Sequence, residues 1–245
     1  MCRLMGYVAS TDTTFSDLAG SDFSQFQSLA SKHRDGWGVA VTPSQGEAKV
    51  ILDPSTALDN EKFAEVTHSL NSDAALLHLR WATLNLKVDA TNNHPFTHGE
   101  YSFIHNGSIN PPASLEALVA DDLKANFVGD TDSERYFYAI LTSIRQHGLE
   151  NGVINAVREI RASLQYSSVN AMLLTPHKFI VITEFNSAKI PDGEGADYYD
   201  LYYRRDERGV LVASSGWNQD GWTLLPNHRM LVVDRSTQEI EIFEI

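Results

Sequence analysis

The order of predicted strands and helices constrains the fold of this chain more than any single motif does. Apolar residues follow strand-like patterns at both ends of the chain and an apolar stripe at helical spacing through its middle. Strands are predicted at 3–9, 39–42, 48–52, 74–81, 101–105, 168–174, 178–184, 198–204, 209–213, 229–233 and 238–243. Helices are predicted at 22–33, 59–71, 114–126, 131–146 and 150–165, with a surface loop at 82–98.

This order contains few strand–helix–strand alternations, which argues against a doubly wound parallel sheet. Two mostly antiparallel sheets with helices on their outer faces fit better, so the predicted fold class is α+β. The pairs Pro176-His177 and Arg208-Gly209 are expected to close hairpins. Because no stretch has the composition of a linker, residues 1–245 are predicted to form a single domain.

The net charge and the cysteine content indicate which classes of binding partner are unfavourable and which cellular compartment to expect. The chain has 19 basic and 32 acidic residues and a net charge of −13, which makes nucleic acid and anionic membranes poor partners. Its single cysteine allows no intrachain disulfide. Neither a signal-peptide pattern nor an apolar run of the ~18 residues needed to span a bilayer is seen, so a cytoplasmic protein is expected.

The single cysteine, Cys2, directly follows Met1. Removal of Met1 by an aminopeptidase, which we expect for so small a second residue, would leave a thiol and a free amine on one carbon. Such a residue combines a nucleophile with a base. The alternative is that Cys2 is simply a small buried apolar residue.

Other segments offer polar groups suited to a small charged substrate. Arg80 lies at the end of a predicted strand and carries a planar fork that matches a carboxylate, although a surface ion pair is the usual fate of an arginine. Asn106-Gly107 follows another strand and provides N–H donors for an oxyanion, although this dipeptide also forms tight turns. Asp132, near a predicted helix start, suits either an ammonium group or helix capping.

Taken together and in order, these motifs resemble the class II glutamine amidotransferase domain, the cysteine type of N-terminal-nucleophile hydrolase. The motifs are Met-Cys-Arg at 1–3, His-Arg-Asp-Gly-Trp-Gly at 33–38, His-Leu-Arg-Trp-Ala-Thr at 78–83, Asn-His-Pro-Phe at 93–96, His-Asn-Gly at 105–107 and Asp-Thr-Asp-Ser-Glu at 130–134. Within the family, the chain looks most like stand-alone members such as the γ-glutamyl amidases of ergothioneine biosynthesis. The resemblance implies a four-layer αββα sandwich.

The resemblance also implies a role for each matched residue. Cys2 would be the nucleophile, with its α-amine as the general base, and the Asn106 side chain and Gly107 N–H would form the oxyanion hole. Arg80 would bind the α-carboxylate and Asp132 the α-ammonium of a glutamine or γ-glutamyl group. Trp81 and Thr83 would line the substrate site, and Arg34, Asp35 and His105 would lie close behind it.

The expected reaction is hydrolysis of the γ-amide of glutamine or of a γ-glutamyl compound through a Cys2 thioester, without metal or cofactor. Ammonia would pass to a separate synthase, or an amine would simply be released. One alternative is a non-catalytic subunit that binds glutamine for such a synthase. Another is a metalloenzyme using His94 and His98, but Pro95 between them prevents a regular helix and no common metal-binding motif occurs.

Overall fold

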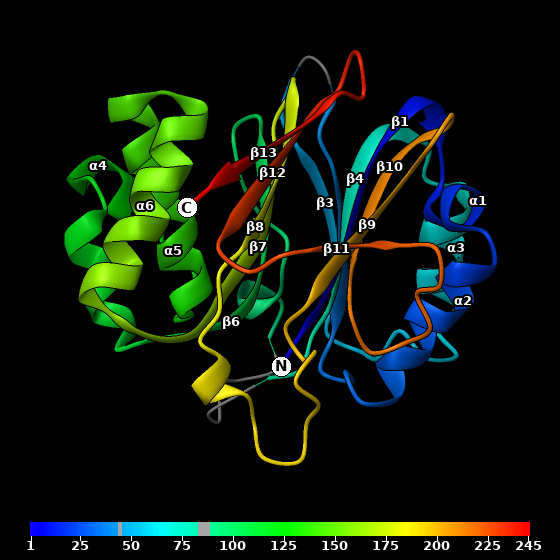
Figure 1. Cartoon of the computed structure of the whole chain (residues 1–245), viewed down its shortest axis with the longest axis horizontal. Helices are drawn as coiled ribbons and strands as arrows, with labels where there is room; N and C mark the ends of the chain where they lie inside the picture. Colours follow the sequence, from blue (N-terminus) through cyan, green and yellow to red (C-terminus); the bar gives the residue numbers. More distant parts are fainter. Residues whose placement is uncertain (44–45, 83–88) are drawn as a thin grey trace.

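The computed structural model describes residues 1–43, 46–82 and 89–245. Two stacked β-sheets lie between two layers of helices, and the N terminus lies at one end of the sheets (Figure 1). Every strand pair in the described part of the chain is antiparallel. The prediction of an α+β fold with four αββα layers is therefore confirmed.

The first sheet contains both the N-terminal strand and strands from the C-terminal third. Its spatial order is β11 (Thr223–Leu225), β9 (Leu201–Asp206), β10 (Gly209–Ser214), β1 (Arg3–Thr13), β4 (Ser72–Leu79), β2 (Trp37–Val41) and β3 (Lys49–Asp53). β1 therefore pairs on both edges, with β10 and with β4. This central position holds the start of the chain rigidly.

The second sheet is built from the middle and the end of the chain. Its order is β13 (Ile240–Glu244), β12 (Arg229–Asp234), β8 (Lys178–Thr183), β7 (Gln165–Leu174), β6 (Tyr101–Asn110) and β5 (Phe96–His98). The hairpin predicted at 176–177 joins β7 to β8. β5 and β11 are short strands that the sequence patterns did not predict.

Helices cover the outer face of each sheet. α1 (Phe15–Ala19), α2 (Ser21–Ser28), the short 3₁₀ helix η1 (Leu29–Ser31) and α3 (Glu61–Ser69) lie over the first sheet. η3 (Pro112–Leu118), α4 (Asp121–Lys124), α5 (Asp132–His147) and α6 (Leu149–Ser163) lie over the second. Two further 3₁₀ helices are η2 (Ala90–Asn92) and η4 (Ser187–Lys189). No helix among the described residues is long and apolar enough to cross a membrane.

Three apolar layers follow from strand alternation. Leu4 and Val8 of β1 pack between the sheets with Ile104 of β6, whereas Met5 and Tyr7 face the helices of the first sheet. Residues on one strand thus alternate between the central core and an outer core. This alternation decides which polar side chains reach the space between the sheets.

Several predictions are wrong in detail. The strand predicted at 198–204 begins only at Leu201, the strand predicted at 101–105 continues to Asn110, and the helix predicted at 22–33 is α2 followed by η1. The single helix predicted at 114–126 is replaced by η3 and α4, separated at Val119 and Ala120, where the backbone is extended. Residues 92–95 lie within the predicted surface loop but are buried against β2. An Asn-rich segment with no apolar period carries no local signal of burial, because its burial depends on Gly38 of β2 and on Gly36 just before this strand.

Candidate active site

Three strands direct polar side chains into one end of the space between the sheets. Cys2 has the same strand parity as Leu4, which belongs to the central core. Arg80 likewise has the parity of Leu76, and Asn106 has the parity of Ile104. Cys2 directly precedes β1 and Arg80 directly follows β4, whereas Asn106 lies within β6. Because side chains at even spacing share one face of a strand, extending the alternation by one residue directs all three toward the layer between the sheets.

A cavity lies where these strands meet α5. It is lined by Cys2, Arg80, Trp81, Ala82, Asn92, His94, His105, Gly107, Thr131, Asp132 and Ser133. It contains five of the residues that the family resemblance assigned to catalysis or substrate binding, together with His105. Within the described part of the chain, no group of three or more His, Cys, Asp or Glu side chains is arranged to hold a metal ion.

Cys2 lines this cavity and is half-buried as a residue, and its Sγ lies 3.8 Å from the Trp81 carbonyl oxygen. Burial raises the pKa of the thiol above its ordinary value, so the protonated form is favoured near neutral pH. The terminal nitrogen of Met1 lies 2.7 Å from the Tyr198 hydroxyl, and burial lowers the pKa of this amine to about 5. An amine in these surroundings is therefore mostly uncharged at pH 7.

Arg80 is only 3% exposed and is held by two loops. Its Nη1 donates to Asn93 Oδ1 at 3.0 Å and to the Asp35 carbonyl at 3.5 Å. Asp35 in turn accepts a hydrogen bond at 2.8 Å from the backbone N–H of Ala82. Asp35 thus fixes the segment that carries Arg80 and Trp81, as expected for a residue just behind the cavity.

Asp132 is the first residue of α5, whose N-cap Thr131 accepts a hydrogen bond from the Glu134 N–H. The two Asp132 carboxylate oxygens accept backbone hydrogen bonds from Ile109 at 2.7 Å and from Ser133 at 2.9 Å. These contacts orient the carboxylate at the cavity while leaving it further acceptor capacity.

His105 lies beside Asp132 and connects it to β7. Its Nε2 is 3.1 Å from the Ser168 carbonyl, which can only accept, so Nε2 carries the proton. Its Nδ1 then accepts from the Ser133 hydroxyl at 2.8 Å. Burial lowers the pKa of His105, which keeps the ring neutral. His105 therefore orients Ser133, the neighbour of Asp132.

Gly107 of β6 lines the cavity, whereas the side chain of the neighbouring Asn106 is not among the residues that line it. Asn106 is 1% exposed, and neither atom of its side-chain amide has a hydrogen-bond partner among the described residues. A buried amide normally has a partner, so an unpaired one next to a cavity suits a ligand that supplies it. A Cβ on Gly107 would lie 1.8 Å from the Ser168 carbonyl oxygen, so only glycine fits there.

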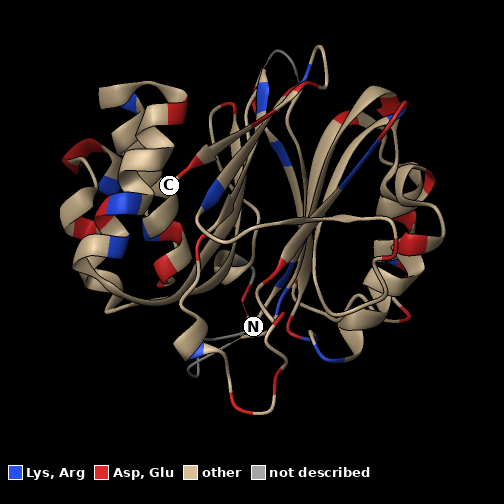
Figure 2. Cartoon of the chain, in the orientation of Figure 1, with Lys and Arg blue, Asp and Glu red and all other residues tan. Residues whose placement is uncertain are grey.

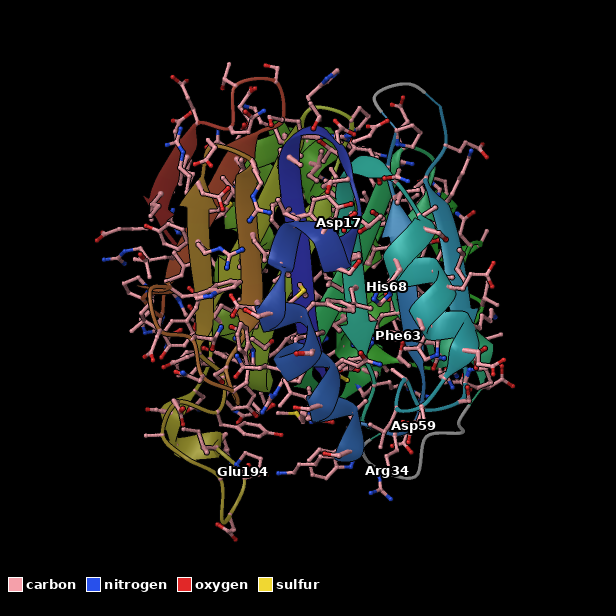
Figure 3. All side chains as sticks on the ribbon, turned by 90° about the vertical axis from the view of Figure 1, so that its right-hand side faces the viewer. Asp17, Arg34, Asp59, Phe63, His68 and Glu194 are labelled. Atoms are coloured by element: carbon pink, nitrogen blue, oxygen red, sulfur yellow. The ribbon has the colours of Figure 1, made fainter. Side chains whose placement is uncertain are left out.

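Of the other residues that the resemblance assigned to the site, one lines the cavity, one points away from it and one is not described. Trp81 lines the cavity and stacks edge-on with His33. Arg34 is exposed, bonds to the Ser31 carbonyl and points away from the molecule (Figure 3), so its side chain does not support the cavity. Thr83 lies outside the described residues.

Several residues at the site were not predicted as functional. Asn93 holds Arg80, Ser133 connects His105 to Asp132, and Tyr198 contacts the terminal amine. Asn93 belongs to a motif recognised in the sequence, but its burial was missed. Tyr198 is separated from Met1 by 197 positions, and no local pattern indicates that contact.

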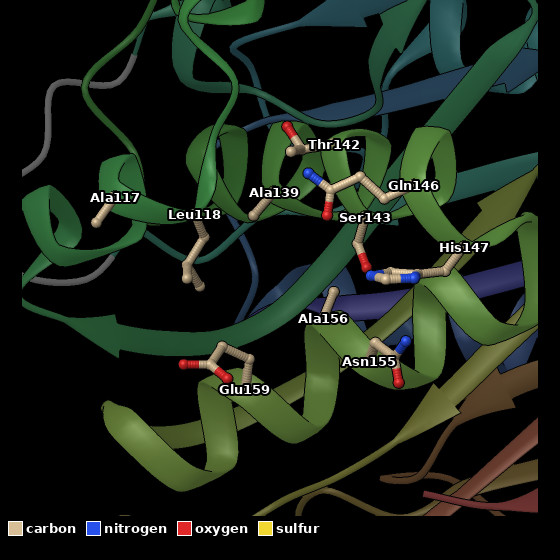
Figure 4. Close-up of a pocket in the computed structure, with 10 residues that line it drawn as sticks. All are labelled: Ala117, Leu118, Ala139, Thr142, Ser143, Gln146, His147, Asn155, Ala156 and Glu159. Carbon is tan, nitrogen blue, oxygen red and sulfur yellow. The ribbon is translucent and has the colours of Figure 1, made fainter.

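A second cavity lies apart from Cys2, between η3, α5 and α6 (Figure 4). It has a volume of about 330 Å³ and is lined by the residues labelled there, including Gln146, His147 and Glu159. These residues come entirely from the outer helix layer. This cavity therefore shares no residue with the one at Cys2.

The sequence profile of the family described as glutamine amidotransferases class-II matches residues 1–239. The chain belongs to this family. Among similar proteins, one from Saccharomyces cerevisiae named "probable glutamine amidotransferase" is 23% identical, and the match covers 83% of this chain and 70% of that protein. The gamma-glutamyl-hercynylcysteine sulfoxide hydrolase of Mycolicibacterium smegmatis is 22% identical, with 81% and 77% covered.

Longer family members match over one part only. The glutamine–fructose-6-phosphate aminotransferase of Francisella tularensis is 21% identical over 80% of this chain but only 31% of its own length. Among solved structures, a glutamine aminotransferase class-II domain protein from Silicibacter pomeroyi superimposes with a TM-score of 0.69 at 19% identity over 99% of both chains. The glutamine phosphoribosylpyrophosphate amidotransferase of Bacillus subtilis gives 0.65 at 15% identity, covering 99% of this chain and 49% of that one. These structures share the fold described above.

Proposed function

We propose that residues 1–245 form one amidotransferase domain that hydrolyses a γ-glutamyl amide through a thioester on Cys2. The observation that carries the proposal is the convergence of Cys2, Arg80, Gly107 and Asp132 on one cavity. Cys2 directly precedes β1, Arg80 directly follows β4, Gly107 lies in β6, and Asp132 is the first residue of α5. Family membership makes this chemistry the natural one for such a site.

The two charged groups match the two charges of a glutamyl group. The guanidinium of Arg80 suits the α-carboxylate, and the carboxylate of Asp132 suits the α-ammonium. Hydrogen bonds that involve charged groups stabilise a bound state by about 1.5–3 kcal/mol each. With both charges bound, the γ-amide extends toward the thiol of Cys2.

The general base in this proposal is the α-amine of Cys2 after Met1 has been removed. The thiol is protonated near neutral pH because burial raises its pKa, so a base must accept its proton. Burial lowers the pKa of the present terminal amine to about 5. The Cys2 amine would occupy nearly the same surroundings and would also be a free base at pH 7.

The steps follow from these roles. The amine takes the thiol proton, and the sulfur attacks the γ-carbonyl carbon to form a tetrahedral oxyanion. The Asn106 amide and the Gly107 N–H stabilise this oxyanion, and loss of one such donor typically lowers the rate about 10²–10³-fold. The ammonium then protonates the departing nitrogen as the carbon–nitrogen bond breaks. Water hydrolyses the thioester and releases glutamate and the free thiol.

The test combines mass spectrometry with an assay of glutamate release. Purified protein should lack Met1, and it should release glutamate from glutamine or from γ-glutamyl peptides. Cys2→Ala should abolish release while leaving thermal unfolding unchanged. An active protein that retains Met1, or an active Cys2→Ala variant, would rule out the mechanism.

The same assay separates hydrolysis from ammonia delivery to another protein. Release from glutamine alone, stimulated by a co-purifying synthase, would identify the chain as the glutaminase subunit of a complex. Tight binding of glutamine without any release would instead support a non-catalytic glutamine-binding subunit.

A further inference from the structure

The side chain of Met1 occupies a defined seat rather than an open end of the chain. Met1 is only 8% exposed and clusters with Tyr198 and Tyr199, and Phe185 and Ile190 pack against this cluster. Its Sδ lies 3.8 Å from both the Ser167 and the Tyr199 hydroxyl oxygens. Chain termini are usually poorly held, so this close packing is unusual. We call these five surrounding residues the Met1 seat.

The Met1 seat adjoins the cavity but is made of other residues. None of its five residues lines the cavity that contains Arg80 and Asp132. The two are connected through β6, because Ser167 Oγ is 2.9 Å from the hydroxyl of Ser108, which follows Gly107. The segment that carries Ile190, Tyr198 and Tyr199 runs beside the N terminus (Figure 1). Cys2 therefore lies between the glutamyl cavity and the seat.

The proposed reaction requires a leaving group on the side of Cys2 where Met1 now lies. The Cys2 nitrogen must protonate the departing nitrogen and so must come within hydrogen-bond distance of it. In the present chain the Cys2 nitrogen is bonded to the carbonyl carbon of Met1. Removal of Met1 frees the volume next to the nitrogen and empties the seat beyond it.

We propose that the emptied Met1 seat binds the leaving group of the substrate, and that this group is an amine the size of an amino acid with an unbranched apolar or thioether side chain. This inference rests on the proposed function. Aromatic and aliphatic walls suit the apolar part, and the hydroxyls of Ser167 and Tyr199 suit a sulfur or another weak acceptor. Ammonia from glutamine would leave the seat unfilled, so γ-glutamyl peptides are the better substrates.

The test compares three substrates with the Met1-processed protein: γ-glutamylmethionine, γ-glutamylglycine and glutamine. We expect kcat/KM for γ-glutamylmethionine to exceed that for γ-glutamylglycine by about 10- to 100-fold, because only the former fills an apolar seat. Ile190→Trp, which fills the seat from within, should remove this preference. The matched control Leu224→Trp, at an exposed position on β11, should retain it.

A second measurement needs no variant. Free methionine, a product, should inhibit the hydrolysis of glutamine, whereas free glycine at the same concentration should not. Glutamate release that is equal for all three substrates, or a preference that survives in Ile190→Trp, would overturn the seat and leave the proposed function intact. No release from any of the three would overturn the proposed function and the seat with it.

Discussion

At the scale of single residues, the site depends on how burial sets protonation. Burial favours the neutral thiol of Cys2 and a neutral amine beside it, which is the pair of states that N-terminal nucleophile chemistry needs. It also keeps His105 neutral, with its proton on Nε2. In the proposed function, Arg80 and Asp132 are the residues that bind the charges of the substrate, and each is held by backbone or amide groups.

Replacement of Arg80 by lysine tests whether its fork binds the substrate. Arg80→Lys keeps the positive charge but loses the planar pair of donors, so we expect KM for γ-glutamyl substrates to rise roughly 10-fold or more with a smaller change in kcat. Steady-state kinetics measures both. Arg158→Lys, at an exposed position of α6, is the matched control. An unchanged KM would remove Arg80 from the carboxylate site.

Replacement of Asp132 by asparagine separates charge from position. Asp132→Asn keeps an oxygen that can accept from Ile109 or Ser133 but removes the negative charge. We expect weaker binding of glutamyl substrates, by about 10-fold or more for a charged contact worth 1.5–3 kcal/mol. The corresponding des-amino substrate analogue should bind equally to both forms. An equal loss of affinity for the glutamyl substrate and for its des-amino analogue would show that Asp132 acts only in capping α5.

At the scale of elements, β2 makes room for the segment that holds Arg80. A Cβ on Gly38 would lie 2.2 Å from the His94 carbonyl oxygen, and one on Gly36 would lie 2.6 Å from the Asn93 amide. Asn93 donates to the Asp53 carbonyl of β3 and accepts from Arg80. The absence of side chains at Gly36 and Gly38 therefore lets residues 93–95 approach the backbone around Trp37 closely.

Gly38→Ala should therefore disturb this packing. The added methyl meets backbone that cannot move alone, and we expect a loss of about 1–3 kcal/mol in the free energy of unfolding. Denaturant titration measures it. In the control Gly195→Ala, the methyl meets only the movable Asp197 carboxylate. Equal stability of the two variants would mean that residues 93–95 shift easily.

At the scale of the whole molecule, the two sheets enclose several uncharged histidines in an acidic protein. Acidic residues are spread over both outer helix layers and the loop beside the N terminus (Figure 2). In the interior, the rings of His78 and His94 lie 4.2 Å apart and those of His94 and His105 lie 6.5 Å apart. Burial lowers the pKa of all three, and it lowers the pKa of His33 to about 4.

These histidines make the fold sensitive to acid. Below about pH 6.5 the histidines of the unfolded chain bind protons, whereas the buried histidines of the folded chain do not. The stability that the neutral histidines contribute is therefore complete above that pH and is lost as the pH falls. Each histidine adds a slope of up to about 1.4 kcal/mol per pH unit to the free energy of unfolding. Denaturant titrations between pH 4.5 and 8 should show this fall.

His94→Leu isolates one contribution, because neither ring nitrogen of His94 has a hydrogen-bond partner among the described residues. This variant should have a shallower dependence on pH and no loss of stability at pH 8. The exposed His147→Asn variant should behave like the parent protein. A slope that is unchanged in His94→Leu would show that His94 is not kept neutral by the fold.

Local patterns in the sequence were enough to predict the α+β class, the antiparallel sheets and most elements. The helix predicted at 131–146 is α5, with Thr131 as N-cap and Gly148 as C-cap. The predicted strand end correctly located Arg80, whereas Asn106 and Gly107 lie inside β6, which continues past the predicted end to Asn110. The order of motifs indicated the family. These features depend on side-chain periodicity, capping and turns, which involve residues only a few positions apart.

Only the tertiary structure decided which of these residues come into contact with one another. Arg80 is held by Asn93, Asp132 by the backbone of Ile109, and Met1 by Tyr198, over separations of 13, 23 and 197 positions. The same packing buried residues 92–95 and directed Arg34 outward. Such contacts depend on how two sheets stack and on where glycines let backbones approach. The sequence by itself therefore determined Cys2 as the candidate nucleophile, and packing determined the cavity and the Met1 seat on either side of it.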